Sequence, residues 1–289
     1  MIHYLLAVRS DREGFEHLAA MAVDARELFA SRLEVDFSRC GSFDANMASP
    51  LAAVLARIAD RFNAIEIVNV PVAIETILRK NDFLASYGYR AIDDESQTTL
   101  PFRRIQRSDE GRFADYLEQH LRGKGIPDLT DGLGKALKQS IFEVFQNAVI
   151  HSESQLGVFV CGQFYPQAQR LVVTMADAGV GIRTNVRRYL RTNVSSADAI
   201  RWALEGGHTT KTGSQPGGVG LKFLRDVVEA NEGTIQVASR LGFYEYRGGQ
   251  EKLEKLAADL PGTSVNIEVD TSNTGNYRLP SEVLPGEIF

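Results

Sequence analysis

Three polar side chains recur at a fixed spacing within an apolar stretch of the chain. Glu143, Asn147 and His151 stand four residues apart, so a helix places all three on one face. The side chains around them are apolar and indicate that the helix buries its other sides: Ile141, Phe142, Phe145, Ala148 and Val149. A carboxylate and an amide beside a buried surface need polar partners, which a divalent cation bound to phosphates would supply.

A glycine-rich turn comes directly after a predicted strand and begins with an acid. Its sequence is Asp177-Ala-Gly179-Val-Gly181-Ile182. An acid at the end of a strand can accept a hydrogen bond from an exocyclic amine such as adenine N6. The two glycines let the backbone approach a flat ring without obstruction by a Cβ atom. This turn therefore predicts the site of a purine base.

A second glycine-rich segment, 206–220, opens a predicted helix. Its motif consists of Gly217, Gly218, Gly220 and Leu221, and it is preceded by Thr209, Thr210 and Lys211. Free N–H groups and the positive end of the helix dipole make such a turn an anion site. Two roles remain open for Lys211: a phosphate ligand or a solvated charge.

Hydrophobic periodicity divides the chain into an α/β unit over 1–95, a second unit over 96–270 and a polar tail over 271–289. In the first unit we expect strands at 2–8, 33–37 and 65–70, and helices at 11–30, at 49–62 and from Pro71. In the second we expect strands at 100–105, 157–164, 170–176, 233–239, 241–247 and 264–269, and helices at 108–121, 129–151, from about 184, and at 219–230.

Composition limits the function classes. The 289 residues are 44% hydrophobic and carry a net charge of -5, which disfavours nucleic acid as a partner. The two cysteines, Cys40 and Cys161, are too far apart for a zinc-ligand motif and too few for a disulfide scaffold. No apolar stretch approaches the length of a membrane helix, and no secretory leader is evident. We expect a cytoplasmic protein that does not enter a membrane.

The order of these motifs, closed by Gly262-Thr263, resembles the ATP-binding domain of the GHKL superfamily, which includes gyrase, a class of heat-shock chaperones, histidine kinases and MutL. The resemblance covers roughly residues 120–270. It implies a two-layer α/β sandwich, the Bergerat fold, with helices on one face of a mixed sheet. It also implies that Mg-ATP binds between those helices and a mobile lid.

The resemblance assigns roles to individual residues. Asn147 would ligate the Mg²⁺ that bridges the phosphates, and Asp177 would accept from adenine N6 with water-mediated help from Thr263. Gly179, Gly181 and Ile182 would lie along the base. The second glycine-rich segment would contact phosphate through Gly217, Gly218, Gly220 and Leu221, with Thr210 and Lys211 in the lid.

Glu143 distinguishes the possible reactions. Its position resembles that of the general base in gyrase-like ATPases and in anti-sigma-factor serine kinases, where a carboxylate takes a proton from the attacking oxygen. ATP hydrolysis and phosphoryl transfer to a protein serine or threonine both remain open. The alternative is a non-hydrolysing ATP sensor that controls a protein partner. An ATP-gated homodimer is a third possibility.

The amino-terminal unit resembles a STAS domain, the kind of domain that partners those serine kinases. The likeness lies in the segments 35–38, 42–47 and 65–78. Ala45 and Asn46 stand where a STAS domain usually has its phosphoacceptor serine. The unit is therefore expected to serve in regulation or in docking a protein partner, which could itself be STAS-like.

Overall fold

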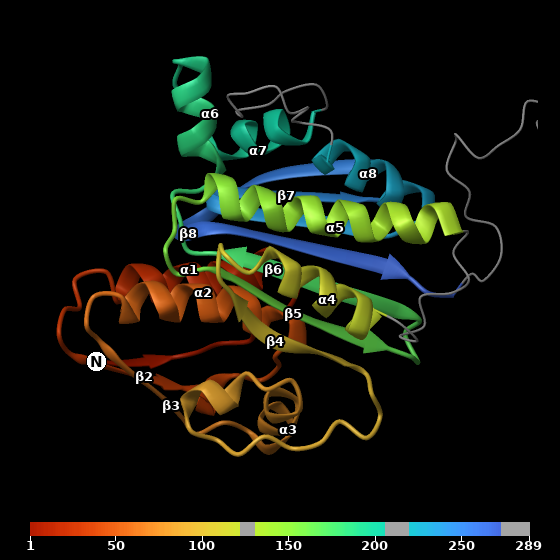
Figure 1. The fold of residues 1–289 in the computed structure, drawn as a ribbon. Helices are drawn as coiled ribbons and strands as arrows, with labels where there is room; N and C mark the ends of the chain where they lie inside the picture. Colours follow the sequence, from red (N-terminus) through yellow and green to blue (C-terminus); the bar gives the residue numbers. More distant parts are fainter. Residues whose placement is uncertain (122–130, 206–219, 273–289) are drawn as a thin grey trace, which may run out of the picture.

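The chain forms two β-sheets with a layer of helices between them (Figure 1). The computed structural model describes residues 1–121, 131–205 and 220–272. The predicted α+β class is confirmed: one sheet is parallel and three-stranded, and the other is antiparallel and five-stranded.

The amino-terminal unit contains the parallel sheet. Its strands lie in the order β1 (Ile2–Tyr4), β2 (Arg32–Asp36) and β3 (Ala64–Val68). Its helices are α1 (Arg12–Asp24), α2 (Ala48–Ala59) and α3 (Val72–Lys80), with short 3₁₀ turns at Phe37–Arg39, Ala45–Met47 and Leu84–Tyr87. Asp11 caps α1 by accepting a hydrogen bond from the N–H of Gly14 at 2.8 Å.

The second unit contains the antiparallel sheet. Its strands lie in the order β4 (Thr99–Ile105), β5 (Val158–Tyr165), β6 (Arg170–Asp177), β8 (Gln250–Asp270) and β7 (Thr234–Arg247). Its helices are α4 (Glu110–Leu121), α5 (Asp131–His151), α6 (Ile182–Leu190), α7 (Ser196–Leu204) and α8 (Gly220–Ala230). In the described ranges all four strand pairings of this sheet are antiparallel, so the mixed sheet expected from the resemblance is not found there.

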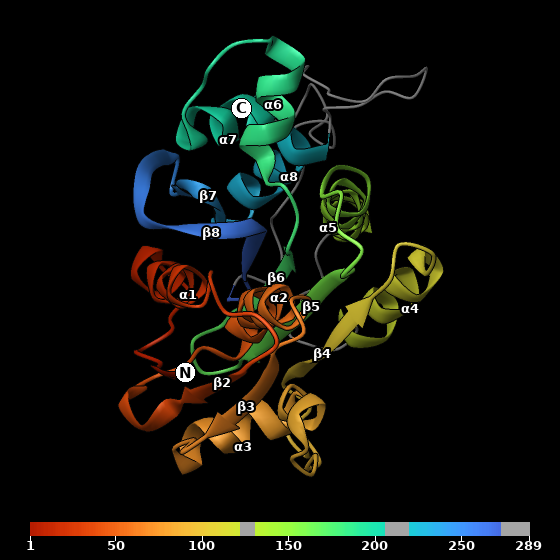
Figure 2. The same ribbon diagram turned by 90° about the vertical axis from the view of Figure 1, so that its left-hand side faces the viewer.

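Both faces of the five-stranded sheet are covered. Alternation along β6 sends Leu171, Val173 and Met175 to the front face, into one core with α4, α5, α7 and α8. It sends Ala176 to the back face, into a second core with α1 and α2. Figure 2 shows these two helices between the sheets. The second unit alone is thus a two-layer sandwich, but its back face is not left to solvent.

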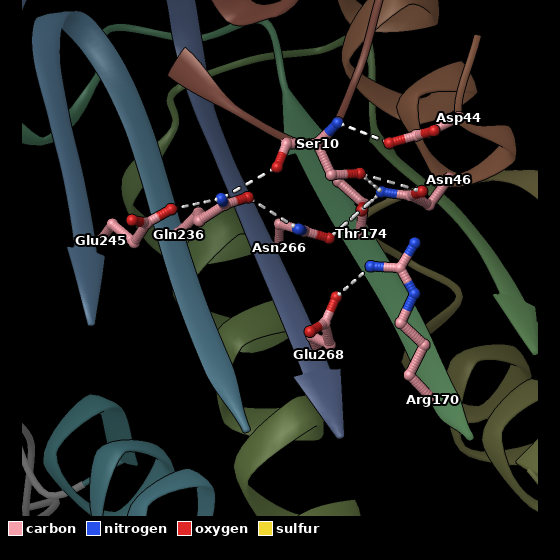
Figure 3. Close-up of polar contacts among 9 residues, drawn as sticks. All are labelled: Ser10, Asp44, Asn46, Arg170, Thr174, Gln236, Glu245, Asn266 and Glu268. Carbon is pink, nitrogen blue, oxygen red and sulfur yellow. Dashed lines mark hydrogen bonds and ion pairs between the residues drawn. The ribbon is translucent and has the colours of Figure 1, made fainter. Parts of the chain in front are cut away.

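A ring of polar side chains joins the two units across the back of the five-stranded sheet (Figure 3). Thr174, Asn266 and Gln236 are neighbours in register on three strands. Thr174 donates to Asn266 Oδ1 at 2.7 Å, and Asn266 Nδ2 donates to Gln236 Oε1 at 2.9 Å. From the other unit, Asn46 Nδ2 donates to Thr174 Oγ1 at 2.8 Å.

Ser10 completes the ring from the amino-terminal unit. Its carbonyl accepts from Gln236 Nε2 at 2.9 Å, and its hydroxyl lies 3.2 Å from Asn46 Oδ1. Asn46 is fully buried in this contact. Asn46, which stands where a STAS domain usually has its phosphoacceptor, is therefore buried against the second unit of the same chain.

The sequence predicts a boundary between two units at residue 95, but in the structure the two units pack against each other. Phe102 of β4 donates its N–H to the carbonyl of Asn81 at 2.6 Å. Cys161 of β5 lies in the core of α1 and α2, with its Sγ 3.4 Å from Asn81 Nδ2. Burial raises the pKa of the Cys161 thiol to about 12, and that of Cys40, in the same core, to about 11.

Several elements differ from the sequence-based prediction: β1 and α1 are shorter than expected, and the hairpin strands and one helix also differ. The strands expected at 233–239 and 241–247 are one strand, β7, which passes through a bulge near Arg240 and pairs with β8 over its whole length. Gly248 and Gly249, with φ of +56° and +75°, form the hairpin turn, and residues 250–262 continue as strand. Helix α7 was not predicted. Among the described residues, no helix is both long and apolar enough to cross a membrane.

We expect Asn46→Ala to lower the free energy of unfolding by about 1–3 kcal/mol, because it removes a buried donor from the ring. Thr174→Val removes the hydroxyl at nearly constant volume and should have a similar cost. In urea denaturation, the double variant should depart from additivity by about 0.5–3 kcal/mol, since the two groups bond each other.

Thr76 provides the control for this cycle. Its hydroxyl donates to the Val72 carbonyl on α3 and is exposed. Asn46→Ala combined with Thr76→Val should be additive. Additive costs for Asn46→Ala and Thr174→Val would show that the ring does not couple the two units.

Candidate functional site

Helix α5 presents Glu143 and Asn147 on one face, and both side chains are half-buried. The opposite sides of the helix are buried against the front of the sheet through Ile141, Val144, Phe145 and Val149. Glu143 accepts a hydrogen bond from Gln139 Nε2 at 3.2 Å. Within the described part of the chain, the Asn147 amide makes no hydrogen bond, so its oxygen is available to a ligand.

Asp177 ends β6 on the front face of the sheet, the face that α5 covers. Its side chain is 4% exposed, and its Oδ1 accepts the Gly179 N–H at 2.8 Å. Burial raises the pKa of Asp177 from 3.8 to about 7, against the opposing effect of backbone N–H donors at Gly179 and Thr263. A buried carboxyl that titrates near neutrality is a common feature of ligand sites.

Gly179 brings the turn after β6 against the end of α5. A Cβ at this position would lie 1.9 Å from the carbonyl oxygen of Ser152. The adjacent Val180 N–H donates to that same oxygen at 2.9 Å. The glycine is thus required for close backbone packing, a role that the sequence-based prediction did not give it.

Thr263 lies beside Asp177, as predicted, because the two are paired in register between β8 and β6. Gly262, at φ +79°, allows β8 to approach the backbone of Asp177 closely, because a Cβ there would lie 2.0 Å from the Asp177 carbonyl oxygen. The Thr263 hydroxyl lies 3.0 Å from the hydroxyl of Ser239 on β7. Asp177, Thr263 and Ser239 therefore converge on one end of the front face.

Ser239 is the residue of this group that sequence reasoning missed. It accepts the N–H of Ile182 at 3.0 Å and donates to the carbonyl of Gly262 at 3.0 Å. It thereby fixes the first residue of α6 to β8. The signal was its register opposite Thr263, which becomes readable only once β7 and β8 are known to pair.

The remaining predicted residues are only partly described. Gly181 precedes α6 with φ +79°, and a Cβ there would lie 2.7 Å from Arg240 Cγ. Gly220 and Leu221 begin α8, which packs against α5, in agreement with the expected helix start. Thr209, Thr210, Lys211, Gly217 and Gly218 lie outside the described residues.

The site extends along α5. Ser152, which contacts the turn after Asp177, is nine residues from Glu143, or about 13 Å at 1.5 Å per helical residue. Asn147 lies between them. In the described ranges no three His, Cys, Asp or Glu side chains gather to hold a metal ion. A cation at Asn147 would therefore need further oxygen ligands from a bound phosphate.

No family model matches the chain, and no curated protein matches its sequence. The GHKL and STAS resemblances therefore stay predictions.

The raised pKa of Asp177 predicts how stability depends on pH. The native carboxyl holds its proton at higher pH than the unfolded one, so its contribution to stability is complete below pH 3.8 and is lost as pH rises to about 7. Asp177→Asn cannot ionise and keeps an oxygen for the Gly179 N–H. We therefore subtract the unfolding free energy of the variant from that of the unaltered protein, both measured by urea titration. This difference should decrease as the pH rises through this range, and a constant difference would contradict the assignment.

Proposed function

We propose that the chain binds Mg-ATP along α5, with the base at Asp177 and the phosphates toward Glu143. The observation that carries this proposal is the position of Asp177, a buried carboxyl with a pKa near neutrality, on the sheet face that α5 covers. The motif order that resembles the GHKL superfamily supports the same ligand.

At the base end, the ionised Asp177 carboxylate accepts the N6 amine of adenine, and the Thr263 hydroxyl holds the bridging water. The Asp177 side chain is already oriented by the Gly179 N–H, so little conformational freedom is lost on binding. A carboxylate rejects a base that presents a carbonyl oxygen in place of N6, because two acceptors would face each other.

At the phosphate end, the Asn147 oxygen is a suitable ligand for Mg²⁺, which prefers oxygen donors and binds readily with phosphates. Helix α8 runs alongside α5 (Figure 1) and begins at Gly220. The positive end of its dipole favours an anion near that residue. Magnesium would neutralise phosphate charge when the nucleotide is bound.

Glu143 lies one helical turn beyond Asn147 and is the proposed general base for water or for a protein hydroxyl. In an enzyme it would orient the attacking oxygen, while positioning and Mg²⁺ supply most of the rate. The outcome would be ATP hydrolysis or phosphoryl transfer to a serine or threonine.

A non-hydrolysing ATP sensor is the second candidate function, and one observation favours it. Ala176 and Ala178, on either side of Asp177, both pack into the core formed with the amino-terminal unit. A ligand at Asp177 could therefore alter what that unit presents to a protein partner or to a second copy of the chain.

Nucleotide binding tests the proposal. By calorimetry, Asp177→Asn should weaken both adenosine and Mg-ATP roughly ten- to hundredfold, since it removes a charged acceptor. Asn147→Ala should weaken Mg-ATP and leave adenosine unchanged. Val72→Ala, a truncation at the exposed start of α3 in the other unit, is the control. Undiminished Mg-ATP affinity in folded Asp177→Asn and Asn147→Ala would refute the site.

Turnover separates the enzyme from the sensor. If Glu143 is the base, Glu143→Gln should keep Mg-ATP affinity and lose phosphate release or phosphotransfer about 10²- to 10⁴-fold. Glu232→Gln, a change of an exposed acid, should have no effect. Tight binding without turnover in the unaltered protein would instead indicate the sensor.

A further inference from the structure

A basic pocket of about 610 Å³ lies between α6, the start of α7 and the β7–β8 hairpin. Its guanidinium groups come from α6, from the residue that follows it and from β7: Arg183, Arg187, Arg188, Arg191 and Arg240. Among its described lining residues the single acid is Asp259. Among its described lining residues none comes from α5, and neither Asp177 nor Thr263 is one of them.

Two of the five guanidinium groups have no protein partner in the described part of the chain. Arg240 pairs with Asp259, Arg188 pairs with Glu153, and Arg183 donates to the Val194 carbonyl at 2.8 Å. The exposed side chains of Arg187 and Arg191 make neither a hydrogen bond nor an ion pair with any described residue. The pocket therefore offers both fixed and unengaged arginines.

The like charges on α6 repel one another, and a bound anion would relieve that repulsion. Arg183, Arg187 and Arg191 recur every four residues, a spacing at which like charges on a helix repel. The dipole of α6 favours cations in its last turn. It does not account for Arg240, which reaches the same pocket from β7. Since the whole chain has a net charge of -5, the basic cluster is a local feature rather than a general one.

The start of α7 adds a buried hydroxyl to the lining of the pocket, although Ser195 caps this helix and Asp198 lies in its first turn. This helix has nine residues, and the positive end of its dipole lies at Ser196, a lining residue. Ser196 is 5% exposed, and its hydroxyl has no hydrogen-bond partner. A buried hydroxyl without a partner next to a basic pocket indicates that a polar ligand belongs there.

We propose that this pocket binds a small ligand that carries two or more phosphate groups. Guanidinium forks bind phosphate oxygens in pairs, and arginines on two elements can hold two such groups at once. The volume lies within the range of small-molecule sites. Because α6 starts directly after Gly181, the ligand would also stabilise the turn that carries Asp177. This inference does not depend on the proposed function.

Calorimetry of the full chain with inorganic pyrophosphate, without divalent cations, tests the proposal. We expect binding that weakens with added salt. Replacing the two unengaged arginines together, as Arg187→Gln with Arg191→Gln, should weaken it at least about tenfold. Both side chains are exposed, so the variant should fold. Arg26→Gln removes an arginine whose side chain is 73% exposed on another surface and should leave affinity unchanged.

Other outcomes would overturn the assignment. Absence of pyrophosphate binding, or equal binding by the double variant, would exclude the pocket. Binding that appears only with added Mg²⁺ and is lost in Asn147→Ala would place the anion in the nucleotide site instead. Equal affinity for citrate would remove the preference for phosphate, and displacement of pyrophosphate by an oligoglutamate peptide at lower concentration would assign the surface to an acidic protein.

Discussion

The polar side chains on the back of the five-stranded sheet are buried and must be hydrogen-bonded, and the amino-terminal unit supplies their partners. Thr174, Asn266 and Gln236 lie on three adjacent strands, and Asn46 and Ser10 close the ring from the other unit. An unpaired buried amide costs about 1–3 kcal/mol. Apolar surfaces tolerate small displacements, whereas directional bonds favour one relative position of the two units.

This constraint gives β6 two functions at once. Its front residues pack against α5 and lead to Asp177, while its back residues hold Thr174 and Ala176 against the amino-terminal unit. A rigid strand with both faces buried cannot shift on one side alone. Any ligand that moves the turn after Asp177 therefore acts on the packing of α2 as well, which gives the sensor hypothesis a physical route between its two ends.

The sequence predicts much of this arrangement, because each predicted part depends on local patterns. The four-residue spacing on α5 and the acid at the end of β6 follow from periodicity and turn chemistry, whereas Thr263 was assigned only through the resemblance, and its register opposite Asp177 comes from the structure. The covered back face could not be predicted in this way. Alternation in Ser264-Val-Asn266-Ile-Glu268 is typical of a sheet with one solvated face, and only the tertiary contact with Asn46 shows that Asn266 is buried. The β7–β8 hairpin was also missed, although the pair Gly248-Gly249 is a sequence signal for a two-residue hairpin turn.

The reactivity of the two cysteines can report on whether the two units are in contact. Cys161 lies at the junction of the units and Cys40 within the first, and both thiols are buried with raised pKa values. The thiolate is the reactive form, so neither should react with alkylating reagents while the units stay together. Comparing the labelling rates of the two positions would distinguish separation of the units, which frees Cys161 first, from unfolding of the amino-terminal unit, which frees both.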